Sequence, residues 1–231
     1  GIVNFSPRLA GEWENKLVHT MRFGCEKVSI DDSPYRTVIK SEGKFLPQSC
    51  FWGFDTTITY TVTSGGNIKI DFDLTPYGKN KPSVLGRVGA FFTLDGDYRR
   101  CDWIGRGPDE NYPDCKAHTP VGIYSADISD MRFPYDVPQE SGNHGDCSKV
   151  TVYGNGRKLT VLGDFSFSFH SVPLSDLKKA RHCDELEESD AHYLYIDHKH
   201  RGLGSNSCGP QPEKEYELPL GEFHWSIRLE T

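Results

Sequence analysis

The sequence contains little methionine and no long apolar run. Only 2 Met occur in 231 residues, beside 13 Phe and 11 Tyr, and aromatic side chains are typical of strands rather than helices. No apolar stretch approaches the ~20 residues of a membrane-spanning helix. No signal-peptide pattern opens the chain, although its start at Gly1 rather than Met leaves room for an upstream part. These absences predict a soluble protein rich in β-structure, with no membrane partner.

A run of basic residues is also absent. The formal net charge is −7 at pH 7, whereas a protein that binds nucleic acid neutralises a row of phosphates with Lys and Arg. We therefore expect no nucleic-acid partner.

The cysteines form no recognisable pair. Their number, 7, is odd, and no C-x-x-C occurs, which argues against a zinc site and against a fully paired set of disulfides. Free thiols in a reducing compartment are the simpler interpretation, and they predict a cytoplasmic location.

Alternating apolar and polar residues predict antiparallel hairpins. Thr56–Thr63 and Ile68–Leu74 alternate around a turn that contains Gly-Gly, and Val150–Tyr153 with Leu159–Leu162 repeats the pattern. Only Leu174–Leu186 has the spacing of a helix. We predict one all-β sandwich domain over residues 1–231, with about a dozen antiparallel strands and one short helix.

The stretch Cys101–Pro113 combines aromatic, acidic, Gly and Pro residues, which is too turn-rich for a plain strand. Gly105-Arg-Gly107 lacks the helix and Lys of a phosphate loop, and the chain has no G-x-S-x-G. The adjacent carboxylates Asp109 and Glu110 are typical of turns, as are Asp127 and Asp130 beside the Pro-rich segment Ile123–Ser141, which we expect to run over the surface. We therefore predict no catalytic residue in this chain.

His198 and His200 lie two residues apart on an expected strand, so both rings can face one side. The neighbouring Lys199 and Arg201 would repel a divalent cation. We predict no metal site here.

The loop Gly202–Pro210 has a different composition. Its Ser205, Asn206, Ser207 and Cys208 are small polar residues enclosed by Gly and Pro, and such residues can approach the hydroxyl groups of a ligand. A tight turn between strands is the alternative. We predict that these four residues bind substrate.

Three motifs together resemble a known family. They are the first motif, Trp103–Asp114, the second motif, Asp130–Asn143, and the third motif, Gly202–Pro210. In order and spacing they resemble the C-terminal domain of family-two β-galactosidases, which some members carry as a separate small chain. The resemblance implies an antiparallel supersandwich similar to that of galactose mutarotases.

The resemblance also implies the activity. The family hydrolyses terminal non-reducing β-D-galactosides such as lactose with retention, and its catalytic Glu pair lies on a (β/α)8 barrel that this chain lacks. An Arg-rich motif that precedes the domain in the family is absent as well. The isolated chain is therefore expected to be inactive, to need the barrel part as its partner, and to be homo-oligomeric at full length. No cofactor is expected in this chain, and the resemblance leaves Mg²⁺ or Na⁺ open for the whole enzyme.

In the family, the third motif reaches the mouth of the active site. Certain members place a Trp there against the leaving group, where this chain has Cys208. The resemblance therefore implies that the enzyme with Cys208 holds the leaving group of its substrate more weakly than the members with Trp do. Two alternatives remain: a stand-alone carbohydrate-binding sandwich, and a mutarotase-like epimerase that would use His144 and Glu140.

Overall fold

The computed structural model describes residues 7–48, 51–177, 179–204 and 211–231. Their contacts divide the chain into two compact units. The first unit is Gly86–Leu218, and the second unit combines Pro7–Leu85 with Pro219–Thr231. Both consist mainly of antiparallel strands, which confirms the all-β class, while the single domain over residues 1–231 stays a prediction.

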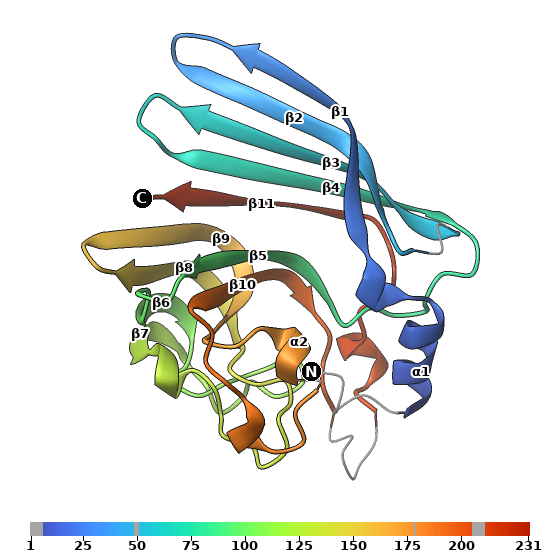
Figure 1. Cartoon of the computed structure of the whole chain (residues 1–231), viewed down its shortest axis with the longest axis vertical. Coiled ribbons are helices and arrows are strands. Elements are labelled where there is room, and N and C mark those ends of the chain that lie inside the picture. Colours follow the sequence, from blue (N-terminus) through green and yellow to red (C-terminus); the bar gives the residue numbers. More distant parts are fainter. Residues whose placement is uncertain (1–6, 49–50, 178, 205–210) are drawn as a thin grey trace. The chain divides into compact units, whose positions relative to one another are not determined.

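The second unit is one meandering sheet with a helix before it. Its strands follow the order β1-β2-β3-β4-β11, and every neighbouring pair is antiparallel, as Figure 1 shows. The elements are α1 (Pro7–Asn15), β1 (Arg22–Asp32), β2 (Arg36–Leu46), β3 (Trp52–Thr63), β4 (Ile68–Gly78) and β11 (Phe223–Glu230), with a 3₁₀ turn at Val18–Thr20.

The predicted hairpin of residues 56–74 is confirmed in β3 and β4. Tyr60 pairs with Ile70 across the two strands, and Gly66 has φ 82°, a left-handed conformation that costs glycine little. On β4 and β11, the rings of Phe72 and Trp225 stack with their centroids 4.5 Å apart. The alternation and the Gly-Gly therefore predicted the hairpin and its turn.

Helix α1 was not predicted. Its Trp13 is 7% exposed, and the indole Nε1 donates to the carbonyl of Val84 at 2.8 Å. The carboxylate of Glu12 accepts from the amide of Ser83 at 2.7 Å. These partners lie 71 residues away, so the helix depends on tertiary contacts more than on its own sequence.

The first unit contains the three motifs. Its strand order is β7-β6-β8-β9-β10-β5, again antiparallel throughout (Figure 1). The strands are β5 (Arg87–Asp95), β6 (Arg100–Arg106), β7 (Val121–Asp127), β8 (His144–Gly154), β9 (Arg157–His170) and β10 (Ala191–His200). Short helical turns are η2 (Ile128–Asp130), α2 (Leu174–Leu177), η3 (Cys183–Glu185) and η4 (Lys214–Tyr216).

One expectation in the first unit was wrong. Residues 101–106 are a strand, because Gly105 lets β6 approach Cys147: a Cβ at Gly105 would lie 2.2 Å from that Sγ atom. The segment of residues 123–141 begins as strand β7. Ile123 on this strand is 81% exposed, so β7 lacks the buried face that would have revealed it.

The predicted helix of residues 174–186 is present only as the four-residue α2 and the turn η3. Leu177, the apolar side chain that α2 buries, is fully buried. On β9, the period-two Phe165, Phe167 and Phe169 are all buried.

No helix among the described residues is long and apolar enough to cross a membrane. The five cysteines that the structure describes are free thiols, namely Cys25, Cys101, Cys115, Cys147 and Cys183.

Candidate functional site at the meeting point of the motifs

The first and third motifs are joined through Asp114. One carboxylate oxygen accepts from the amide of Leu203 at 3.1 Å, and the other accepts from the amide of Gly204 at 2.5 Å. Gly202 allows this approach, since a Cβ there would lie 2.7 Å from Asp114 Cγ. Gly204 has φ 65°. A charged acceptor thus fixes the start of the third motif.

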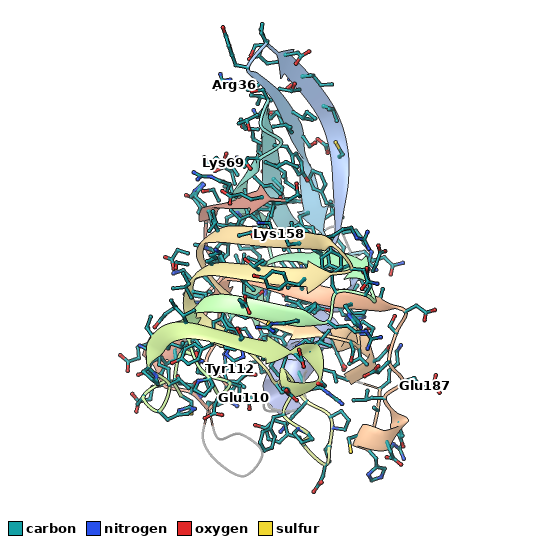
Figure 2. The ribbon with its side chains drawn as sticks, turned by 90° about the vertical axis from the view of Figure 1, so that its left-hand side faces the viewer. Arg36, Lys69, Glu110, Tyr112, Lys158 and Glu187 are labelled. Atoms are coloured by element: carbon teal, nitrogen blue, oxygen red, sulfur yellow. The ribbon has the colours of Figure 1, made fainter. Side chains whose placement is uncertain are left out.

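The first and second motifs are joined through Glu110. Its carboxylate accepts from the hydroxyl of Tyr135 at 2.5 Å and from the amide of Gly142 at 2.6 Å. Figure 2 labels Glu110 and its neighbour Tyr112 in the first unit. Both oxygens of Glu110 therefore serve to hold the second motif.

Asn111 and Asn143 add a second link between these motifs. The backbone N–H of Asn111 donates to the carbonyl of Asn143 at 2.7 Å, and the side-chain Nδ2 of Asn143 donates to the carbonyl of Asn111 at 2.7 Å. Asn111 Oδ1 also accepts from the amide of Gly145 at 2.8 Å. Both asparagines are 1% exposed, so these bonds are shielded from water and define the loop geometry.

A buried charge cluster lies beside this junction. Arg87 Nη2 is 3.0 Å from Glu140 Oε1 and 3.0 Å from Asp197 Oδ2. The side chains of Glu140 and Asp197 are 7% and 3% exposed. His200 Nε2 lies 3.9 Å from the same Glu140 oxygen. One guanidinium therefore serves two carboxylates, supplied by a loop and by strand β10.

The two carboxylates respond differently to this arrangement. Burial opposes the charge on Glu140, but Arg87 and His200 outweigh it and hold the pKa of Glu140 well below its usual range. At Asp197, burial prevails over Arg87 and raises the pKa. Glu140 is thus the carboxyl group that Arg87 more strongly favours in its charged form.

Several buried polar atoms near this cluster have no hydrogen-bond partner in the described protein. His170 is unpaired at both ring nitrogens, and burial lowers its pKa to about 4. Ser168, which faces Tyr195 in the strand register, is unpaired at Oγ. Tyr112 Oη and Asn143 Oδ1 are unpaired as well. Such groups usually pair with ordered water or a ligand.

Two pockets flank the junction. The first, the polar pocket, has a volume of about 380 Å³. Residues of the first and second motifs form one wall, strands β9 and β10 form another, and η4 closes the third side. Its lining includes Asn111, Tyr112, Lys116, Asn143, Asp146, Asp164, Ser166, His198, His200 and Tyr216.

The second, the aromatic pocket, has a volume of about 610 Å³. The first and second motifs supply most of its lining, including the ring pair of Phe133 and Tyr135. Its lining is Pro108, Asp109, Glu110, His118, Ala126, Ser129, Asp130, Met131, Arg132, Phe133, Pro134, Tyr135 and His144.

The predicted substrate-binding residues Ser205, Asn206, Ser207 and Cys208 lie outside the described residues. The epimerase pair is not brought together in either pocket. Glu140 belongs to the Arg87 cluster, whereas His144 has its Nδ1 3.3 Å from the carbonyl of Arg106 and lines the aromatic pocket. Among the described residues, no three His, Cys, Asp or Glu side chains gather as a metal site would require.

Sequence reasoning missed three residues that organise the site. Arg87 lies at the start of β5 and Asp197 near the end of β10, 110 residues apart. No local sequence pattern connects two single charged residues at such a separation. Asp114 ends the first motif directly after Pro113, and no local pattern connected it with the third motif.

The comparisons with known proteins agree with the motifs. The family model of the beta galactosidase small chain matches residues 6–229. The chain is 30% identical to the beta-galactosidase of Kluyveromyces lactis over 98% of its own length and 22% of that protein. It is 34% identical to the beta-galactosidase of Alteromonas mediterranea over 88% of its length and 20% of that protein. The chain thus spans about a fifth of the length of these relatives.

Among solved structures, the chain is similar to a galactose 1-epimerase from Lactobacillus acidophilus, at 8% identity and a TM-score of 0.39. The likeness covers 88% of this chain and 65% of that one. From the match of nearly its whole length to the family model, the chain belongs to the beta galactosidase small-chain family.

Proposed function

We propose that this chain is the C-terminal part of a β-galactosidase. The whole enzyme hydrolyses terminal non-reducing β-D-galactosides such as lactose, with retention, and its catalytic Glu pair lies on a (β/α)8 barrel outside this chain. The family match over residues 6–229 is the observation that carries the proposal. By itself, the chain is inactive.

The use of the carboxylates at the site supports this assignment. Retaining hydrolysis needs two carboxyl groups about 5 to 5.5 Å apart, one of which acts as an acid. Glu110 accepts two protein donors, Asp114 accepts two backbone amides, and Glu140 is held as a carboxylate by Arg87. Each is engaged by donors of the protein itself, which leaves none of the three free for acid catalysis.

The contribution of the chain is to shape the edge of the active site. Asp114 fixes Leu203 and Gly204, and the residues that follow, Ser205 to Cys208, contact the galactoside on its leaving-group side. Cys208 has no ring to stack on a sugar. In the full-length enzyme, Cys208→Trp is therefore expected to lower the KM for lactose and to increase transglycosylation, and unchanged values of both would refute this role.

The remaining assignments follow from this context. The partner is the barrel part of the same enzyme, and the full-length protein forms a homo-oligomer. No cofactor binds to this chain, and any Mg²⁺ or Na⁺ belongs to the rest of the enzyme. Cytoplasmic location is supported by the free thiols of the described cysteines.

The test is an assay of this chain alone and mixed with the barrel-bearing part. We expect no hydrolysis of a chromogenic β-galactoside by the chain alone and hydrolysis by the mixture. Galactose anomer interconversion is followed in parallel. Hydrolysis by the chain alone would refute the proposal, and rapid anomer interconversion would support the epimerase alternative.

A further inference from the structure

The aromatic pocket contains polar groups that the protein itself does not use. Within the described part of the chain, no side-chain hydrogen bond or ion pair engages the carboxylate of Asp109 or the guanidinium of Arg132. Asp130 receives only a long contact of 3.4 Å from Ser129 Oγ. By contrast, both oxygens of the adjacent Glu110 are occupied. The lining of the pocket thus includes both acceptors and a planar donor.

His144 supplies another acceptor to this pocket. The ring is 2% exposed and lies against Trp103 and Phe167, with centroids 4.6 and 5.4 Å away. Because the carbonyl of Arg106 can only accept, His144 Nδ1 carries the proton of their 3.3 Å contact. Burial lowers the pKa of His144 to about 4, so the ring is neutral at pH 7. Its Nε2 is then an acceptor that no described protein group engages.

The aromatic pair provides an apolar surface next to these groups. The ring centroids of Phe133 and Tyr135 are 4.6 Å apart, at an interplanar angle of 47°. Glu110 holds the hydroxyl of Tyr135, while Phe133 is 56% exposed. An exposed ring of this size on a loop held by hydrogen bonds to Glu110 indicates a contact surface for a ligand.

The combination of groups selects the class of ligand. A sugar presents the C–H face of its ring to an aromatic side chain, and it presents adjacent hydroxyl pairs to carboxylates and guanidinium groups. The lining carries Asp109 and Asp130 against Arg132, so a phosphate would meet two negative charges. A volume of about 610 Å³ lies within the range of small-molecule sites.

We propose that the aromatic pocket binds a neutral saccharide of one or two rings, which stacks on Phe133 and forms hydrogen bonds to Asp109, Arg132 and His144. This site is independent of the proposed hydrolytic activity, since its binding can be measured whether or not the protein hydrolyses galactosides.

The test is saturation-transfer NMR on the full-length protein, with galactose, lactose and cellobiose as separate probes. Phe133→Ala is expected to weaken the affinity of this site about tenfold, and Asp109→Asn to weaken it severalfold. Phe91→Ala is the matched control, because Phe91 is also exposed, at 59%, and stacks on a tyrosine, Tyr195. It is expected to bind as wild type does.

Two readouts separate this site from the site of hydrolysis. The kcat for a chromogenic β-galactoside is expected to be the same in Phe133→Ala and Phe91→Ala. For each of the three sugars, saturation transfer that is equal in wild type, Phe133→Ala and Asp109→Asn would overturn the proposal. So would the absence of transfer from the wild-type protein to every sugar.

Discussion

The two units bury different kinds of side chains. Among the described residues, every buried polar side chain except that of Thr56 belongs to the first unit, where the charged residues Glu140, Asp197 and Arg201 are buried. In the second unit, strands β1 and β2 bury no residue at all. The second unit therefore depends on backbone pairing and alternating side chains, and the first unit depends on compensation between buried polar groups.

Removing Arg87 should produce the largest effect. Arg87→Met leaves Glu140 and Asp197 buried without their cation, and breaking such a pair typically costs about 3 to 5 kcal/mol. We expect the free energy of unfolding, measured by urea denaturation of the first unit's transition, to fall by that amount.

The comparison in the second unit is Lys44→Met. Lys44 pairs with Asp55 at 2.6 Å, but both side chains are exposed, at 39% and 58%. We expect no resolvable change in the urea midpoint. Equal losses in the two variants would contradict the contrast between the units.

The next largest difference between the two units is expected in the pH dependence of their stability. Burial lowers the pKa of His170 and of His144 to about 4 each, below the value of about 6.5 in the unfolded chain. Between these values, the unfolded state binds protons that the folded state does not bind. Stability of the first unit should therefore fall as the pH drops from about 6.5 to 4, by up to about 1.4 kcal/mol per pH unit for each histidine.

His170→Phe should remove about half of this slope, since His144 remains. Urea midpoints at several pH values within that window measure the slope, and an unaltered slope in the variant would disprove the assignment. In the second unit, the contact of His224 with Asp73 raises the pKa of His224, so its protonation acts in the opposite direction, adding stability as the pH falls.

A smaller effect is expected at Glu110. Glu110→Gln replaces a charged acceptor of Tyr135 and Gly142 by a neutral one, which should cost about 1 to 2 kcal/mol in urea denaturation. Glu42→Gln, on strand β2, which buries no residue, is the control in the second unit and should leave the midpoint unchanged. A loss in Glu42→Gln as large as that in Glu110→Gln would argue against a special role of the motif junction.

The same contrast explains which features were predictable. The hairpin of residues 56–74 was predicted because alternation and a Gly-Gly turn are local signals. Strand β6 was missed because Gly105 and the following turn residues conceal its alternation, although Cys101 and Trp103 are buried.

At the candidate site, the motifs were recognisable but their contacts were not. The three motifs were identified by their order and spacing, whereas the bonds from Asp114 to Leu203 and Gly204 join residues 89 and 90 positions apart. Arg87 gave no local signal, since its partners come from a distant loop and strand. Contacts of this kind follow from the tertiary fold rather than from local pattern.

The most direct test of the link between the motifs and the active site is Asp114→Ala in the full-length enzyme. The variant removes the acceptor of two amides at the start of the third motif, and Asp114→Asn, which retains one acceptor, should be intermediate. The account predicts a KM for lactose raised severalfold in Asp114→Ala. A KM equal to that of wild type in both variants would contradict it.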